Sequence, residues 1–236
     1  AKKEYQKTKD PMYEKEISRC HNIQWAKKIS LNSAYGAIGN QYFRFYNVHQ
    51  ATAITTSGQF IIQYIEQQVN KYMNDILQTK DKVDYIVASD TDSIYLCLDK
   101  LVEKVCKDKT KEQKINFINK VVENKLEPFI DKCFNELAKY TNAFQQKMVM
   151  KRECIADKGI WTAKKRYMLN VLDEEGFRFE EPKLKIMGIE AVKSSTPEVC
   201  RVAIKEAIKI VMNKEETDLH NYIAKFREEY KQYEPE

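Results

Sequence analysis

The spacing of apolar residues changes twice along this chain, from a helical period to a strand period and back, and this limits the folds that it can form. Apolar side chains recur every three or four positions in residues 12–38 and again in residues 51–78, which predicts two long helices. Farther along, several apolar runs are short and rich in β-branched residues, which predicts strands. The expected strands cover residues 83–88, 94–98, 147–155, 160–172 and 177–187.

Helices are expected between and after these strands. Residues 112–140 have a helical period, in which Pro128 should kink the helix or start a new one. Another helix is expected from Thr196, the predicted N-cap ahead of Pro197, and the last predicted helix covers residues 217–232. Only six glycines and five prolines interrupt the chain, so its elements should be long. Strands in the middle with helices on both sides predict an α+β fold, not a regular βαβ repeat.

The composition favours a globular protein of the cytoplasm. Hydrophobic residues make up 43% and aromatic residues 11% of the 236 residues, enough to form a buried core. No apolar run approaches the ~20 residues of a membrane span. The first ten residues also lack the apolar region of a signal peptide. An integral membrane protein or a secreted protein is therefore not expected.

The six cysteines are widely spaced and include no Cys-x-x-Cys pair. Most of them lie within apolar patterns, so reduced and buried thiols are expected. The three histidines have no metal-ligand spacing with the cysteines, so a zinc site is not expected.

The basic residues are unevenly distributed. The chain has a formal net charge of +5. Residues 147–166 contain seven basic and two acidic residues, so this one stretch has a surplus equal to that of the whole chain. A partner that carries phosphate groups is therefore plausible.

Two acidic residues lie at the tip of a predicted β-hairpin, in the polar sequence Ser89–Ser93. Asp90 and Asp92 are two positions apart, so a tight turn can bring both carboxylates to one small volume. Two unpaired carboxylates repel each other, and a divalent cation removes that penalty. Such oxygen ligands suit Mg²⁺ or Mn²⁺. The alternative is an ordinary solvated turn, because Asp, Thr and Ser are common turn residues.

A second group of polar residues lies near the end of the first predicted helix. Lys28, Asn32 and Tyr35 are at positions i, i+4 and i+7, so they lie on one helical face. The lysine there could meet a polyphosphate as a point charge, and the tyrosine ring could stack on a base or test the shape of a base pair. The alternative is the end of an ordinary amphipathic helix, with the lysine stem packed along it.

A third motif combines basic and aromatic residues within a predicted strand. Strand alternation would place Lys164 and Arg166 on one face and Lys165 and Tyr167 on the other, where Trp161 would partly shelter Lys165. Basic residues interleaved with aromatic ones can hold a nucleic-acid backbone. The alternative is a sheet edge whose charges prevent aggregation.

The order and spacing of these three motifs resemble those of family B DNA polymerases. Residues 28–36 are similar to the fingers motif of that family, residues 90–93 to its second catalytic palm motif, and residues 164–167 to its primer-gripping motif. The segments Ala51–Thr56 and Lys183–Pro197 are most similar to the replicative polymerases of T-even-type bacteriophages. The resemblance covers nearly all of the chain.

The resemblance also implies an architecture. It predicts a palm-type, mainly antiparallel sheet packed on helices, with a long fingers helix at the N-terminus and thumb helices at the C-terminus. Residues 1–40 would be the C-terminal part of the fingers. Residues 41–190 would be part of the palm, and residues 191–236 the truncated base of the thumb.

The resemblance assigns nucleotide binding to the first helix. Lys28 would contact the incoming triphosphate, and Asn32 would lie one turn along the same helix. Tyr35 and Gly36 would lie under the nascent base pair and test its shape.

Metal and DNA binding are assigned, by the same resemblance, to the later motifs. Asp92 would be a principal ligand of two Mg²⁺ ions, for which Mn²⁺ can substitute, with Asp90 in a supporting role. Glu153 aligns with an accessory acidic residue on a neighbouring palm strand. The primer–template would be held by Lys164, Lys165, Arg166 and Tyr167.

The implied activity is template-directed addition of dNTPs to a primer 3′ end by two-metal phosphoryl transfer. Primer–template DNA and dNTPs are therefore the expected ligands. The family's other carboxylate motif and its exonuclease motifs are absent. The chain is thus expected to be a C-terminal portion that is inactive without an N-terminal polymerase half. A sliding clamp and a second copy of the chain are further candidate partners.

Two other functions are compatible with parts of the sequence. A non-catalytic DNA-binding module would need the basic motif but not the two aspartates. A metal-dependent glycosyltransferase would use the Asp-x-Asp pair to hold a nucleotide sugar, but it would not need the other two motifs.

Overall fold

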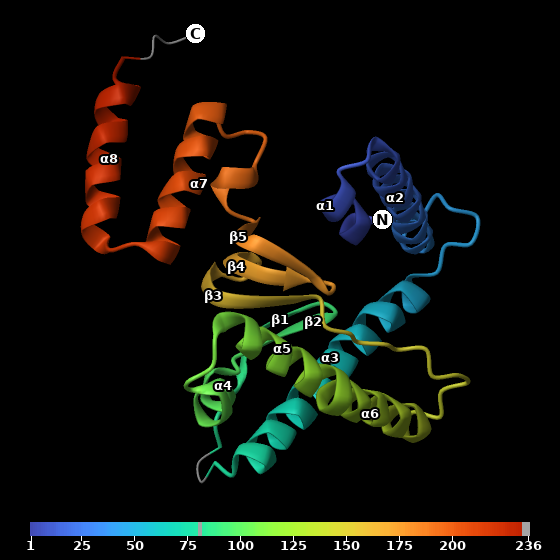
Figure 1. Ribbon diagram of the computed structural model, residues 1–236. Coiled ribbons are helices and arrows are strands. Elements are labelled where there is room, and N and C mark those ends of the chain that lie inside the picture. The colour runs from blue at the N-terminus through green and yellow to red at the C-terminus, as the bar shows by residue number, and fades with distance from the viewer. Residues whose placement is uncertain (80–81, 233–236) are drawn as a thin grey trace. The chain divides into compact units, whose positions relative to one another are not determined.

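The computed structural model describes residues 1–79 and 82–232 and divides into two compact units, Ala1–Arg152 and Glu153–Glu236 (Figure 1). This division falls inside the expected palm, so the assignment of fingers, palm and thumb boundaries stays a prediction. Among the described residues, no helix combines the length and the apolar character needed to cross a membrane.

The first unit begins with the short helix α1 (Lys2–Thr8) and the long helix α2 (Pro11–Ile38). The Asp10 carboxylate accepts a hydrogen bond from the Met12 N–H, and Pro11 occupies the first helical position, so both residues define where α2 starts. The helix buries none of its side chains in the described structure. The predicted helix at 12–38 is therefore confirmed as a helix, but not as one packed through an apolar stripe.

Helix α3 (Val48–Leu77) and helix α6 (Glu127–Tyr140) form the centre of the first unit (Figure 1). One face of α3 buries a stripe of residues four apart, which packs against buried residues of α6. The rings of Tyr72 and Phe129 stack with centroids 4.1 Å apart across this contact. The buried stripe consists of Ile65, Val69, Met73 and Leu77.

The antiparallel hairpin β1 (Ile86–Asp90) and β2 (Ser93–Leu96) follows α3. After it come α4 (Asp99–Cys106), which was not predicted, α5 (Lys111–Val121) and a π-helical turn. That turn spans Val122–Leu126 and leads directly into α6.

The predicted helix at 112–140 is therefore interrupted ahead of Pro128. Pro128 lies in the first turn of α6, where a missing N–H does not interrupt the helical hydrogen bonds.

The second unit contains an antiparallel meander of three strands in the order β3-β4-β5 (Figure 1). After a 3₁₀ turn (Glu190–Val192), α7 packs on this sheet through a small apolar core, and α8 buries none of its described side chains. The core joins Met168 of β4 to Ile208 and Met212 of α7. The elements are β3 (Cys154–Ala163), β4 (Arg166–Glu174), β5 (Phe177–Met187), α7 (Glu198–Asn213) and α8 (Glu216–Tyr230).

Two of the predicted strands are wrong. Residues 147–153 have no regular structure, because their apolar run has no partner strand, and β3 begins only at Cys154. The predicted strand at 160–172 is two strands, because a turn at Lys164 and Lys165 reverses the chain. Neither residue is Gly or Pro, so the sequence carried no turn signal there.

Two smaller predictions also need correction. Helix α7 begins at Glu198 with Pro197 in the capping position, so Thr196 is not the N-cap. The cysteines are less buried than expected. Cys106 and Cys133 are buried, whereas Cys20 is exposed on α2.

Candidate functional site

The tip of the β1–β2 hairpin is a two-residue turn, Thr91 and Asp92, between the paired residues Asp90 and Ser93. The Asp92 N–H donates to the Asp90 carbonyl oxygen at 2.6 Å, and the Ser93 hydroxyl donates to the same oxygen at 3.2 Å. The Thr91 hydroxyl donates to the Asp90 carboxylate at 3.0 Å. The predicted hairpin with a polar tip is thus confirmed, and both acidic residues belong to one small hydrogen-bonded turn.

This turn holds Thr91 in an unusual backbone conformation. Its φ angle is 55°, in the left-handed region that β-branched residues rarely adopt. Such a conformation costs about 1–3 kcal/mol and persists only where the surrounding structure over-determines it. Residues outside the turn must therefore stabilise it.

The side chains of this turn offer only oxygen atoms to a metal ion. Asp90 is half-buried and Asp92 is exposed, and carboxylates of this kind suit Mg²⁺ or Mn²⁺. In the described part of the chain, no group of three or more His, Cys, Asp or Glu side chains is arranged to hold a metal ion. The turn therefore contains two carboxylates, Asp90 and Asp92, and their role as metal ligands stays a prediction.

The predicted nucleotide-binding residues lie on α2. The helix is continuous through Lys28, Asn32 and Tyr35, so the three residues share one face as expected. All three are exposed, with Tyr35 41% exposed. A Cβ built on Gly36 would meet no atom within 4 Å, so a ligand could approach the backbone closely there.

The basic motif spans the β3–β4 turn and the start of β4, and not the middle of one strand. Ala163 pairs with Arg166, and Lys164 and Lys165 form the turn between them. Lys165 has a φ angle of 62° and is exposed. The prediction that strand alternation shelters Lys165 beside an aromatic residue is therefore wrong, because the turn projects both lysines beyond the sheet.

Tyr167 has a structural position within this motif. It pairs with Trp161 across the strands, and their rings stack with centroids 6.2 Å apart. Tyr167 is only 7% exposed, so its ring packs against the sheet instead of forming an open stacking surface.

Gly188 supports the basic turn and was not predicted from the sequence. Its φ angle is 68°, and a Cβ built there would lie 2.1 Å from the Lys165 carbonyl oxygen. Only glycine allows this close approach. The sequence signal was a Gly directly after a predicted strand, which is also typical of an ordinary turn.

A small ion-pair cluster lies beside the same turn. The Glu190 carboxylate accepts a hydrogen bond from the Lys193 ammonium group at 2.8 Å and lies 3.7 Å from the Arg166 guanidinium group. The hydrogen bond from Lys193, with the charge of Arg166 as a smaller contribution, lowers the pKa of Glu190. Arg166 is therefore partly engaged, and the side chains of both turn lysines are exposed.

The two turns of the meander differ in charge. The β4–β5 turn follows Glu174 and contains Glu175, and the buried Asp173 carboxylate accepts a hydrogen bond from the Gly176 N–H at 3.0 Å. Successive turns of a meander lie at opposite ends of the sheet. The second unit therefore has a basic end, and an acidic end at which Arg178 and Lys183 pair with Asp173 and Glu174. A phosphate backbone would be attracted to the basic end.

Glu153, the predicted accessory acid, lies at the acidic end. Its carbonyl oxygen accepts a hydrogen bond from the Glu175 N–H at 2.7 Å, and its carboxylate forms an ion pair with Lys185 at 2.5 Å. The whole of strand β3 lies between it and Lys164, so the two residues are at opposite ends of that strand. Within the second unit, the structure does not bring the accessory acid and the basic motif together.

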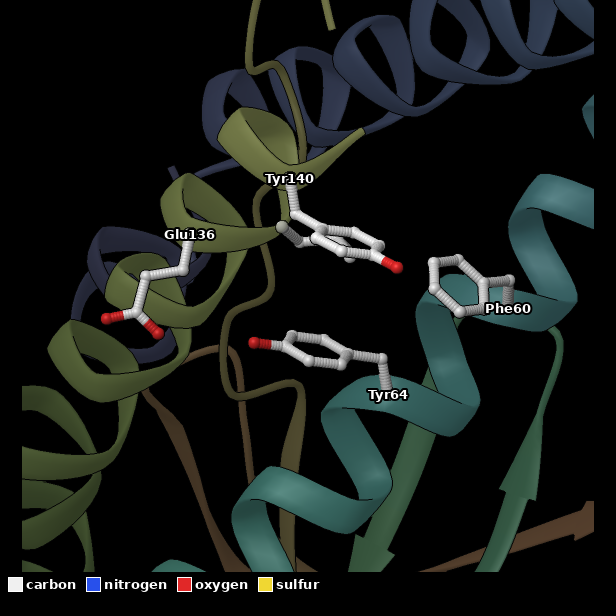
Figure 2. A pocket seen from close by; sticks show the side chains of 5 residues that line it. Phe60, Tyr64, Glu136 and Tyr140 are labelled. Atoms are coloured by element: carbon white, nitrogen blue, oxygen red, sulfur yellow. The ribbon is translucent and has the colours of Figure 1, made fainter. Parts of the chain in front are cut away.

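A pocket of about 390 Å³ lies between α3 and α6 (Figure 2). Figure 2 shows the Tyr64 and Tyr140 rings on opposite sides of the opening, with Phe60 beside them. Burial raises the pKa of the Tyr64 hydroxyl, and the nearby Cys133 and Glu136 raise it further. None of the sequence-predicted site residues lines this pocket, so it is separate from the candidate site.

The comparisons with known proteins agree with the three motifs. The family model for DNA polymerase family B matches residues 1–236. The chain belongs to this family. The DNA-directed DNA polymerase of Enterobacteria phage T4 is 44% identical over 229 residues, which cover 93% of this chain and 25% of that protein. The DNA-directed DNA polymerase of Escherichia phage RB69 is 45% identical over 200 residues, which cover 80% of this chain and 22% of that protein.

This family B chain therefore spans about a quarter of the length of the relatives that it matches. The resemblance to family B polymerases of T-even-type phages and the α+β fold are confirmed. The roles of the individual site residues stay predictions.

Proposed function

We propose that this chain forms the nucleotide-binding and primer-binding part of a replicative DNA-directed DNA polymerase. The observation that carries the proposal is the hairpin tip, which presents Asp90 and Asp92 on a hydrogen-bonded turn in a family B chain.

Asp92 and Asp90 would hold divalent cations, two Mg²⁺ ions or Mn²⁺ in their place. When bound, such cations activate the primer 3′-hydroxyl and neutralise charge on the triphosphate. Hydrogen bonds from the Asp92 N–H and from the Thr91 and Ser93 hydroxyls to Asp90 hold the turn in one backbone conformation, so that the carboxylates would start from defined positions before a ligand arrives.

The exposed face of α2 would bind the incoming dNTP. Lys28 would contact the triphosphate, and Asn32 would lie one turn farther along the same face. Tyr35 and the open backbone at Gly36 would form a surface against the nascent base pair. Steric contact with a ring at that position favours a base pair of the correct width.

The basic end of the second unit would bind primer–template DNA. Lys164 and Lys165 would contact phosphates, whereas Arg166 and Tyr167 would mainly hold the turn in place. Such contacts position a duplex without reading its sequence. This suits an enzyme that must accept every template.

Two carboxylates are fewer ligands than two divalent cations require. We therefore expect that the 236-residue chain alone does not extend a primer, and that further acidic groups from another polypeptide segment complete the site. The extra segment would correspond to the part of the phage T4 relative that this chain does not match.

A chimera would test this proposal. The matching quarter of the phage T4 polymerase is replaced by residues 1–236, and primer extension is measured with Mg²⁺ and all four dNTPs. The chimera should extend the primer, whereas Asp92→Asn should reduce the rate by at least a hundredfold at unchanged DNA affinity. Asp75→Asn, an exposed acid on α3, is the matched control and should have no effect.

Each alternative function would give a different result. Full activity of the Asp92→Asn chimera would contradict the proposed role of the hairpin. An inactive chimera that binds duplex DNA normally would favour a non-catalytic DNA-binding module. Binding of a nucleotide sugar in preference to dNTP and primer–template would favour a glycosyltransferase.

A further inference from the structure

Two asparagines on α3 form hydrogen bonds with the segment that leads into β1. Asn70 and Asn74 are one helical turn apart, next to the buried stripe of α3. Their side-chain amides are directed at the backbone of residues 83–85, just ahead of the β1–β2 hairpin.

The Asn74 side chain bonds both the N–H and the carbonyl oxygen of Val83, as a residue of a neighbouring strand would. Its Oδ1 accepts from the Val83 N–H at 3.0 Å, and its Nδ2 donates to the Val83 carbonyl oxygen at 2.8 Å. The Thr79 hydroxyl donates to the same Oδ1 at 2.5 Å, and Nδ2 also donates to the Asn70 carbonyl oxygen at 2.8 Å. The Asn74 amide is therefore fixed in one orientation from both sides.

Asn70 holds the next two residues. Its Oδ1 accepts from the Tyr85 N–H at 2.8 Å, and its Nδ2 donates to the Asp84 carboxylate at 2.8 Å. The same Asp84 oxygen accepts from the Ile86 N–H at 2.9 Å. The Tyr85 carbonyl oxygen accepts from the Cys97 N–H at 2.8 Å, which links this segment to the chain after β2.

The hairpin needs such support for two reasons. A two-stranded hairpin is marginally stable by itself, and the turn at its tip includes the strained Thr91. A slip of one residue in strand register would also turn every side chain of β1 to the opposite face. The two amides fix Val83 and Tyr85 relative to α3, and so they set where β1 starts, ahead of its register shift between Ile86 and Ala88.

We infer that Asn70 and Asn74 are positioning residues for the metal-binding turn. They act through the backbone of residues 83–86 and set where the Asp90 and Asp92 carboxylates lie. This inference rests on the proposed function for its catalytic meaning, but the positioning itself can be measured without activity.

Hydrogen exchange of the 236-residue chain tests the positioning. The double variant Asn70→Ala/Asn74→Ala should lose tenfold or more of the amide protection in residues 86–96, while α6 keeps its protection. Gln67→Ala, an exposed amide on the same helix, is the matched control and should change neither segment. Unchanged protection of residues 86–96 in the double variant would overturn the inference.

A milder variant decides the case if the double variant loses protection throughout the first unit. Asn74→Ala alone removes the two hydrogen bonds to Val83 and leaves those that Asn70 forms with Asp84 and Tyr85. A loss of protection confined to residues 86–96 supports the positioning role. A uniform loss, or none, overturns it.

Mn²⁺ binding separates this inference from the proposed function. The dissociation constant of Mn²⁺ for the chain, followed by the electron paramagnetic resonance of free Mn²⁺, should rise several-fold in Asn74→Ala and further in Asp92→Asn. If Asp92→Asn binds Mn²⁺ like the unchanged chain, the proposed metal site fails. The hydrogen-exchange comparison then still decides whether the two asparagines position the turn.

Discussion

Gly188→Ala is expected to destabilise the second unit by more than the backbone cost of placing an alanine at a positive φ angle, because it also creates a steric clash. The matched comparison is Gly176→Ala in the β4–β5 turn. Both glycines have positive φ angles, 68° and 78°, but a Cβ at Gly176 would meet nothing within 4 Å. Gly176→Ala therefore measures how much a positive φ angle at an alanine lowers the free energy of unfolding, without a steric clash.

The backbone cost is modest. An alanine in the left-handed region costs about 1–2 kcal/mol, and the stiffer unfolded chain recovers about 0.4–1 kcal/mol. Gly176→Ala should therefore lower the free energy of unfolding by roughly 0–1.5 kcal/mol.

The steric cost applies only at Gly188. Its new Cβ would lie 2.1 Å from the Lys165 carbonyl oxygen, whereas real Cβ contacts stay above 3.0 Å, so that oxygen must retreat by about 0.9 Å. The oxygen belongs to backbone that the neighbouring Tyr167–Met187 pair holds in register. Overpacking of this kind costs about 1–3 kcal/mol. Gly188→Ala should therefore be less stable than Gly176→Ala by about 1–3 kcal/mol.

Urea unfolding followed by tryptophan fluorescence measures this difference. The chain has two tryptophans, Trp25 on α2 and Trp161 on β3, so a Trp25→Phe background leaves a signal from the second unit alone. The midpoint should fall further for Gly188→Ala at an unchanged slope. Equal midpoints for the two variants would refute the argument that Gly188 is required by its contact with Lys165.

Two further predictions concern the chain's charges and thiols. Lys164→Ala/Lys165→Ala should weaken duplex binding for all sequences and reduce the slope of log affinity against log salt by about 1.8, since each phosphate contact contributes ~0.9. Lys183→Ala, which removes an ion pair with Glu174 in the same unit, is the control, and an altered base preference at an unchanged slope would contradict the prediction. Iodoacetamide at pH 8 should modify the exposed Cys20 well before the buried Cys133. Burial raises the pKa of the Cys133 thiol, so little reactive thiolate forms there. Mass spectrometry measures the order of modification, and equal rates for the two cysteines would contradict the prediction.

The long helices could be predicted from the sequence because their pattern repeats over many residues. The expected ranges 12–38 and 51–78 correspond to Pro11–Ile38 and Val48–Leu77. The acidic hairpin was also predictable, since two β-branched runs flank five polar residues. In each case the signal lies within one short stretch of chain.

The strands of the second unit were harder to predict because a strand depends on its partner. The apolar run at 147–153 resembles a strand but forms no described strand pairing. The run through Lys164 and Lys165 contains a turn, although neither residue is of a type that is typical of turns. Register between strands is a long-range property, and the spacing of apolar residues alone does not define it.

The candidate site shows the same division between local and long-range signals. The motif residues were found because their chemistry is concentrated at spacings of two, four or seven positions. Their supports were missed. Asn74 holds Val83 from nine positions away, and Gly188 contacts Lys165 from a distant part of the chain. In the sequence, Asn74 resembles any polar residue on a helix surface.

Strain explains why these two motifs need distant supports. Thr91 and Lys165 are both non-glycine residues with positive φ angles, and each lies in the turn that presents a motif. Neither turn would favour this geometry in isolation, because a left-handed residue other than glycine costs about 1–2 kcal/mol. Glycine would remove that cost, but it would also let each turn sample other conformations. A side chain with a distant support instead gives one fixed geometry, which is what the proposed metal ligands and the proposed phosphate-binding lysines would require.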